Sequence, residues 1–456
     1  MKYQLNHKYR LCGWQGLECG LLNKETGITE FIDPQKFQHL ILCNGEIELD
    51  NIVPTDNLKI YLEEGLISPA GKDTQPRTEP MYRRYNNRYI EYAHWSITGG
   101  CNFKCRHCYM DAPEHKLSDV TLDQLKEIVH QLSACGVFRV KLTGGEPLIR
   151  KDFWELVDEL MAYNIVIDEV YTNGWLVSED VLKKFEKRNL YPTINMSFDG
   201  VGWHDWMRRI PGAENAAVKA FRICDKHGFR TAAEMCVHKG NIHTIRETVK
   251  FLADLNVRKL KIGALVDTEL WQKNCEDMYL TTGEFINACI EYIPQYFADG
   301  CPWKLSLSNI FRYDPEKQTV MLSNDNNCED CGNQYLCNSA RKTIYISPYG
   351  TVLPCMVATA LSQKIQSEFP NMLKSDLVGI LNNSTLIQFA DMKTEQLFSH
   401  NDECRKCEHK NYCKGGCRIE AIRCGDTYGK DETACYLYKN ALNIKIRESV
   451  ENILKG

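Results

Sequence analysis

Strand-like runs alternate with helix-like runs from about residue 88 to about residue 300, and this alternation limits the possible folds more than any other feature of the chain. The helix-like run that starts at Thr121 shows the pattern well, because Thr121 and Gln124 form a capping box before regularly spaced apolar residues. The strand-like runs are residues 89–100, 137–145, 165–174, 192–200, 230–238 and 259–266. Six consecutive strand and helix units predict a parallel α/β sheet covered by helices, with ligand sites at the carboxyl ends of the strands.

The composition is that of a globular protein without a polyanionic partner. The chain has 456 residues, 43% hydrophobic and 25% charged, a length that suggests about three domains. The formal net charge is -5 and like charges do not form long blocks, so we expect neither a nucleic acid nor a membrane surface as a partner. We find no signal peptide and no apolar run near the ~18 residues of a membrane span, which favours a cytoplasmic protein. Its 22 cysteines therefore indicate metal sites rather than disulfides.

We predict three domains: residues 1–87, 88–305 and 306–456. Residues 18–32 read as a hairpin, and a helix follows with Asp33 as N-cap, Pro34 at its first position and Gly45 as its stop. A second helix is expected within residues 54–67, and residues 68–87 read as a linker. Beyond residue 305 the alternation gives way to a region rich in cysteines and turn residues.

Three cysteines, Cys101, Cys105 and Cys108, follow the first strand-like run in the loop CNFKCRHC. A structural zinc site needs four protein ligands, and the nearby His107 adjoins Cys108, where closing so small a chelate would strain the backbone. A 4Fe-4S cluster needs a ligand for each of its four irons, so three thiolates leave one iron open to another molecule. The spacing therefore favours an iron-sulfur cluster over zinc.

This CxxxCxxC loop resembles the signature of radical S-adenosylmethionine (SAM) enzymes. The resemblance implies a partial TIM barrel, (β/α)6, in which SAM binds the open iron and is cleaved to methionine and a 5'-deoxyadenosyl radical. The segment TGGEP, with Gly144, Gly145 and Glu146, is similar to the family's GGEP motif, which holds the methionine amino group. Glycines there would also let the backbone approach a ligand closely, although an ordinary turn is the alternative interpretation.

Further strand ends match the family's SAM site. The resemblance places Ser197 and Asp199, in SFDG, near the ribose. It places Arg208, in HDWMRRIPG, near the methionine carboxylate, with Arg209 as the alternative. Asn173, in YTNG, is a further candidate for cofactor binding, for which a turn-forming role is the alternative.

The C-terminal region carries a second set of cysteines, for which a zinc ribbon is the simplest interpretation. Their order instead resembles the SPASM extension of radical SAM enzymes, which binds two auxiliary 4Fe-4S clusters and so implies three clusters in all. The resemblance assigns one auxiliary cluster to Cys404, Cys407, Cys413 and Cys435. It assigns the other to Cys337, Cys355 and Cys417, with Cys331 as the favoured fourth ligand and Cys328 or a substrate as the alternative.

The remaining cysteines are expected to be small buried apolar residues. Cys236, in the fifth strand-like run, is a candidate catalytic residue, because a thiol facing the barrel interior could donate a hydrogen atom to a substrate radical. Cys224, on the preceding helix, is a weaker candidate. Asp267 is a candidate general base, with a solvated loop carboxylate as the alternative.

The N-terminal hairpin and helices resemble the winged-helix module with which ribosomal-peptide (RiPP) maturases bind a leader peptide. Recognition would then add a strand to the hairpin edge. We therefore expect a precursor peptide as substrate, a thioether or carbon-carbon crosslink as product, and an external electron donor such as flavodoxin or ferredoxin. The alternatives are a peptide epimerase, an anaerobic sulfatase-maturating enzyme and, outside catalysis, an iron-sulfur electron carrier.

Overall fold

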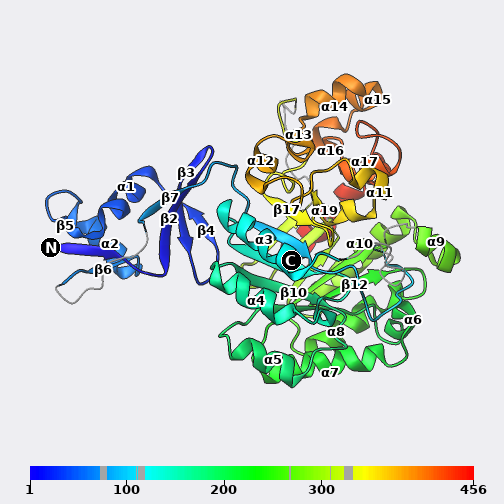
Figure 1. Cartoon of the computed structure of the whole chain (residues 1–456). Helices are drawn as coiled ribbons and strands as arrows, with labels where there is room; N and C mark the ends of the chain where they lie inside the picture. The colour runs from blue at the N-terminus through cyan, green and yellow to red at the C-terminus, as the bar shows by residue number, and fades with distance from the viewer. Residues whose placement is uncertain are drawn as a thin grey trace.

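The computed structural model describes residues 1–71, 80–108, 110, 119–265, 269–308, 310–322 and 332–455. An N-terminal unit, a barrel-like sheet with outer helices and a C-terminal region of short helices follow one another along the chain (Figure 1). The N-terminal unit, in blue, extends from one side of the barrel, and the region drawn in yellow to red lies on another side (Figure 1).

The N-terminal unit contains two small sheets, with strand orders β5-β1-β6 and β4-β3-β2-β7. Its elements are β1 (Lys2–Leu5), β2 (Tyr9–Trp14), β3 (Leu17–Asn23), β4 (Thr29–Phe31), α1 (Pro34–Leu42), β5 (Asn44–Glu48), α2 (Thr55–Glu63), β6 (Ile67–Pro69) and β7 (Tyr82–Arg84). The predicted hairpin is confirmed as antiparallel β3 and β4, and Asp33 caps α1 as expected. Two details were wrong: Gly45 lies within β5 rather than ending α1, and the expected linker contains β7, which pairs with β2.

Trp14 joins the N-terminal unit to the barrel. Trp14 is fully buried and its indole N–H donates to the carbonyl of Cys135 at 3.0 Å. The ring stacks on Tyr85 and shares a small apolar cluster with Phe138. The N-terminal unit is therefore packed against the end of the first barrel helix instead of hanging on a free linker.

All six predicted barrel strands and the helices after them are confirmed. The strands are β8 (Tyr92–Ser96), β9 (Arg139–Thr143), β10 (Val166–Thr172), β11 (Thr193–Ser197), β12 (Thr231–Val237) and β13 (Lys259–Ala264), and they pair in parallel in this order. The helices are α3 (Leu122–Ala134), α4 (Phe153–Ala162), α5 (Glu179–Glu186), α7 (Ala213–Lys226), α8 (Ile245–Asp254) and α10 (Thr282–Ala298). Alternate strand residues pack with the helices in one large core, and Thr121 and Gln124 form the predicted capping box.

The sheet continues past residue 305, where the sequence predicted no further alternation. On one side it adds β14 (Lys304–Leu307), β15 (Phe311–Asp314) and β16 (Thr319–Leu322), and on the other β17 (Thr343–Ile346) and β18 (Val352–Leu353). Because β17 pairs in parallel with β8, the C-terminal region is joined to the strand that leads into the cysteine loop.

The C-terminal region consists mainly of short helices. They are α11 (Gln363–Gln366), α12 (Leu377–Asn382), α13 (Thr385–Ala390), α14 (Thr394–His400), α15 (Asp402–Lys406), α16 (Lys410–Cys413), α17 (Arg418–Arg423), α18 (Glu432–Lys439) and α19 (Leu442–Lys455). Two further helices, α6 (His204–Arg208) and α9 (Glu269–Cys275), belong to the barrel region. Among the described residues, no helix combines the length and the apolar character needed to cross a membrane.

Candidate radical SAM and iron-sulfur site

The three cysteines of the first motif lie in the loop that follows β8, at the carboxyl end of the sheet. The sulfur of Cys101 accepts a hydrogen bond from the backbone N–H of Phe103 at 3.4 Å. Burial, together with the neighbouring thiols of Cys105 and Cys108, raises the pKa of Cys101 to about 12. The structure thus brings the three thiols of the motif together in one place.

Arg208 is the arginine that faces this loop. It donates to the sulfur of Cys105 at 3.7 Å and to the carboxylate of Asp199 at 2.7 Å. Asp199 is fully buried, and although burial alone would raise its pKa, the Arg208 guanidinium holds that pKa below its ordinary value. Arg106 ties the loop to α6, because its backbone N–H and Nε donate to two carbonyls of that helix at 2.9 and 3.0 Å. Arg209 instead ends α6 in a left-handed conformation, with φ of 56°.

The glycines after β9 pack against the cysteine loop. A Cβ on Gly144 would lie 2.5 Å from the carbonyl oxygen of Thr98, and one on Gly145 would lie 2.2 Å from that of Gly100. The backbone N–H of Glu146 donates to the Gly100 carbonyl at 2.9 Å. Only residues without a side chain fit here, so the two glycines hold the end of β9 directly against the loop that carries the thiols.

Glu146 is fully buried and binds the end of the next strand. Its carboxylate accepts from the hydroxyl of Thr172 at 2.8 Å, the backbone N–H of Asn173 at 2.7 Å and the backbone N–H of Leu148 at 3.2 Å. Burial raises its pKa to about 7, although these donors act in the opposite direction. The Asn173 side chain donates to Asn102 in the cysteine loop at 2.8 Å, so Glu146 and Asn173 border the same loop.

Cys236 meets two other polar residues near the cysteines. The ligand atoms of His107, Asp199 and Cys236 all lie within 4.8 Å of one another. The Nδ1 atom of His107 is buried without a hydrogen-bond partner in the described part of the chain, and burial lowers the pKa of this imidazole to about 3. Burial likewise raises the pKa of Cys236 to about 12. Ser197 ends β11 and pairs in register with Glu234, which lies two residues before Cys236 and therefore on the same face of β12.

The second set of cysteines forms two groups in the C-terminal region. Burial raises the pKa of Cys413 to about 12, and the nearby thiols of Cys435 and Cys404 act in the same direction, while Cys404 lies near Cys407. In the other group, Cys355 interacts with both Cys337 and Cys417. Each predicted set of ligands is therefore brought together, except for Cys331 and its alternative Cys328, which lie outside the described residues, as does Asp267.

The donor sets fit iron-sulfur clusters. Thiolates are the usual ligands of such clusters, and N–H donors to sulfur, such as those from Phe103 to Cys101 and from Ala340 to Cys337, tune their potentials. Arg208 supplies a cation beside the triad, as a carboxylate-bearing molecule at an open iron would require. Sequence reasoning weighed His107 only as a zinc ligand and assigned no role to His204, whose Nδ1 accepts from the backbone N–H of Asp199 at 3.0 Å.

The chain matches two protein families. Residues 95–252 match the Radical SAM superfamily, and residues 337–408 match SPASM, an iron-sulfur cluster-binding domain. The chain is 24% identical to Fe-coproporphyrin III synthase of Methanosarcina barkeri, over 76% of this chain and 88% of that protein. It is 25% identical to mycofactocin maturase MftC of Mycobacterium tuberculosis, over 71% of this chain and 77% of that protein.

A solved structure shares the whole architecture. Streptococcus suis SuiB bound to precursor peptide SuiA matches with a TM-score of 0.66 at 15% identity, over 95% of this chain and 99% of that chain. The predicted α/β fold is thereby confirmed. The chain is an enzyme of the radical SAM superfamily, with a SPASM domain that binds iron-sulfur clusters.

Proposed function

We propose that this enzyme abstracts a hydrogen atom from a residue of a ribosomally made precursor peptide and so forms a thioether or carbon-carbon crosslink. The observation that carries the proposal is the N-terminal unit with its open strand edge, placed before a radical SAM and SPASM core. The alignment with peptide-bound SuiB, which leaves only a small part of this chain uncovered, supports it.

The edge strand β4 is suited to bind an extended peptide. In the part of the chain that the structure describes, β4 pairs only with β3. The backbone bonds at Ile28 and Ile32 go to β3, so the alternating pattern turns the backbone groups of Thr29 and Phe31 outward. Ile28 and Phe31 are 50% and 38% exposed, which gives an incoming strand apolar side chains to contact. Backbone bonds to this edge would supply affinity and these side chains selectivity.

The barrel interior contains two ion pairs that differ in their exposure to solvent. Lys141 and Glu169 lie 3.0 Å apart, and their side chains are only 15% and 10% exposed. Nearer the carboxyl ends, Glu234 and Lys261 lie 3.6 Å apart, and their side chains are 31% and 40% exposed. Their neighbours along each strand pack in the helix-side core, so alternation directs this pair to the interior. We infer that the pair contacts the substrate.

The residues of the site would have separate roles in the reaction. When bound, the cluster at the cysteine triad supplies the electron that cleaves SAM to a 5'-deoxyadenosyl radical. Arg208 would bind the methionine carboxylate, and Glu146 in its ionised form would hold the amino group. Asp199 keeps Arg208 oriented, and Gly144 and Gly145 hold the end of β9 against the cysteine loop. Cys236, half-buried beside Asp199, would donate a hydrogen atom if the substrate radical needs one.

Two auxiliary clusters would bring the total to three. The cysteine groups in the C-terminal region would hold them, with Cys331 completing the first group. A crosslink removes two hydrogen atoms from the peptide, one as the abstracted atom and the other as a proton and an electron. An auxiliary cluster held by these cysteines would accept that electron, and an external donor such as flavodoxin or ferredoxin would reduce the cluster at the triad.

A tetrapyrrole is the second candidate substrate, because a relative of similar identity is a Fe-coproporphyrin III synthase. To separate the two, reconstituted enzyme is incubated anaerobically with SAM, dithionite and each short peptide encoded beside its gene, in parallel with tetrapyrroles from which iron coproporphyrin III could be made. A peptide lighter by a pair of hydrogen atoms supports the proposal. A peptide whose mass is unchanged in ordinary water but which takes up deuterium when the reaction is run in heavy water indicates epimerisation. Turnover of a tetrapyrrole alone rejects a peptide substrate.

A further inference from the structure

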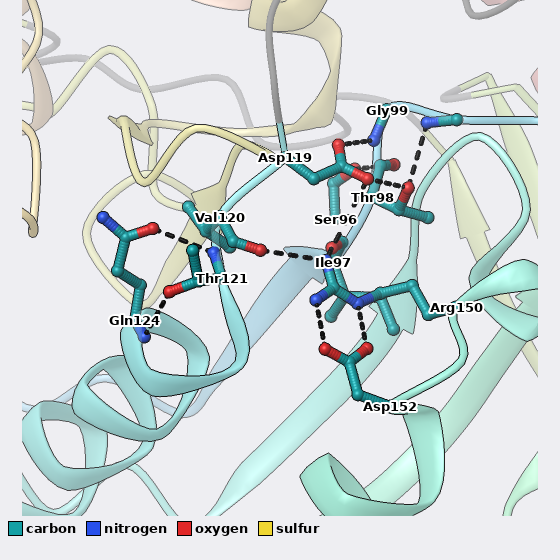
Figure 2. Close-up of polar contacts among 11 residues, drawn as sticks. Ser96, Ile97, Thr98, Gly99, Asp119, Val120, Thr121, Gln124, Arg150 and Asp152 are labelled. Atoms are coloured by element: carbon teal, nitrogen blue, oxygen red, sulfur yellow. Dashed lines mark hydrogen bonds and ion pairs between the residues drawn. The ribbon is translucent and has the colours of Figure 1, made fainter.

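Hydrogen bonds join the two ends of the segment that carries the cysteine triad. The chain leaves β8 through Ile97, Thr98 and Gly99 and enters α3 through Asp119 and Val120 (Figure 2). The carboxylate of Asp119 accepts from the backbone N–H of Gly99 at 2.7 Å and from the hydroxyl of Thr98. One side chain at the end of the segment therefore binds two consecutive residues at its beginning.

Arg150 reinforces this closure from a third segment. Its Nη1 atom donates to the carbonyl of Ile97 at 2.8 Å and to that of Val120 at 3.2 Å, so one guanidinium joins both ends of the cysteine segment. Nε and Nη2 bind the carboxylate of Asp152, each at 2.8 Å, which fixes the guanidinium plane at the start of α4 (Figure 2). The Arg150 side chain is only 9% exposed, and such a planar fork is not replaced by a lysine.

The closure extends directly into the SAM site. The hydroxyl of Thr98 accepts from the backbone N–H of Gly100 at 3.0 Å, and the carbonyl of Thr98 accepts from Gly145 at 2.8 Å. Gly100 in turn accepts from the backbone N–H of Glu146. A short chain of bonds thus leads from Asp119 through Thr98 to the residue before Cys101 and to the glycine segment.

We propose that Asp119 and Arg150 are positioning residues for the cluster at the cysteine triad. By closing the base of the segment they restrict the thiols to the arrangement that binds iron, so less conformational entropy is lost when the cluster and SAM bind. This inference rests on the cysteine triad alone and is independent of the nature of the substrate.

The test uses full-length protein reconstituted with iron and sulfide under anaerobic conditions. Variants Asp119→Asn, Asp119→Ala, Arg150→Lys and Arg150→Gln are compared with Arg188→Gln. Arg188 is the matched control, because it also binds an aspartate, Asp158, through Nε and Nη2, but at the opposite end of the strands from the cysteine loop. Iron content, the electron paramagnetic resonance spectrum of the reduced protein with and without SAM, the dissociation constant for SAM and the melting temperature are measured.

We expect the Asp119 and Arg150 variants to lose iron equivalent to one cluster or to bind SAM about 10- to 100-fold more weakly, as is usual when residues supporting metal ligands are removed. The spectral change caused by SAM should weaken in parallel. Arg188→Gln should keep the iron content, the SAM affinity and the spectral change of the wild type. If Asp119→Ala or Arg150→Gln does not fold, the test rests on Asp119→Asn and Arg150→Lys. A lower melting temperature with unchanged iron content, SAM affinity and SAM response would mean that these residues support only the fold, and would overturn the proposal.

Discussion

Glu234 and Lys261 face each other across β12 and β13, in register, with 3.6 Å between the carboxylate and the ammonium. This separation is longer than a hydrogen bond, so both groups retain capacity for a substrate. We expect Glu234→Gln and Lys261→Met to raise the KM for the precursor peptide several-fold and to leave SAM cleavage without peptide unchanged. The ratio of 5'-deoxyadenosine to modified peptide should also rise, because SAM cleavage beside a misplaced substrate produces 5'-deoxyadenosine without modifying the peptide. The control is Arg246→Gln, which removes one partner of the outer ion pair between Arg246 and Asp299. If this variant raises the KM for the peptide as much as Glu234→Gln and Lys261→Met do, the barrel pair does not contact the substrate.

The pH dependence of SAM binding should follow Glu146. Its pKa is raised to about 7 by burial, so the carboxylate becomes ionised as the pH rises from about 6 to about 8. A carboxylate attracts an ammonium only when ionised, so the affinity for SAM is expected to increase over this range. Without SAM the sign is opposite: the raised pKa means that stability present at low pH is lost as the pH rises through about 7.

Glu146→Gln should abolish this pH dependence of SAM binding, as followed by equilibrium dialysis of the reconstituted protein. The amide would also set a donor against the donors of Thr172 and Asn173, which is expected to cost about 1–3 kcal/mol of folding free energy. If the variant binds SAM with an unchanged pH profile, Glu146 serves only to join the ends of β9 and β10.

Cys236 distinguishes a crosslink from an epimerisation. A crosslink removes hydrogen from the peptide, so Cys236→Ala is expected to leave both 5'-deoxyadenosine and the crosslinked product. An epimerisation would need the thiol, and the variant would then release peptide without deuterium from heavy water. Mass spectrometry of the peptide gives the answer, and Cys224→Ala, which removes a buried thiol on α7, is the control for a general loss of packing.

The open edge of β4 predicts a selective effect on leader binding. Thr29→Pro removes an outward backbone N–H without touching the bonds to β3, so the sheet should survive. We expect the affinity for a fluorescently labelled leader peptide, measured by anisotropy, to fall at least about tenfold, while SAM cleavage without peptide stays constant. Thr29→Ala keeps the N–H and should bind normally. Equal binding by the proline variant would place the leader elsewhere.

Much of the fold follows from the sequence, because regular spacing of apolar residues determines it. The six barrel strands, their helices and the Thr121 cap were all predicted in this way. The strands from β14 to β18 were missed because they are only two to four residues long and separated by turns, too short for a period to be visible. Their partners, such as β8 for β17, are far away in the sequence.

The site was predictable only where a local motif exists. The thiol loop and the glycine segment are continuous stretches, so their residues could be named in advance. Asp119 and Arg150 are isolated charged residues separated by 31 positions, and only the fold brings both to the base of the cysteine segment (Figure 2). Asp199 and Cys236 were named from the sequence, but only the fold shows that their ligand atoms lie within 4.8 Å of each other and of His107.

Hydrogen transfer from the peptide can be measured by isotope tracing. The short peptides encoded beside the gene are produced in heavy water, so that their carbon-bound hydrogen is deuterium, and each is incubated with reconstituted enzyme, unlabelled SAM and dithionite. We predict that 5'-deoxyadenosine gains deuterium with one of these peptides, and that no 5'-deoxyadenosine forms when Cys101, Cys105 and Cys108 are all replaced by alanine. Deuterium-free 5'-deoxyadenosine with every peptide, from wild-type enzyme of full iron content, would contradict a peptide as the hydrogen donor.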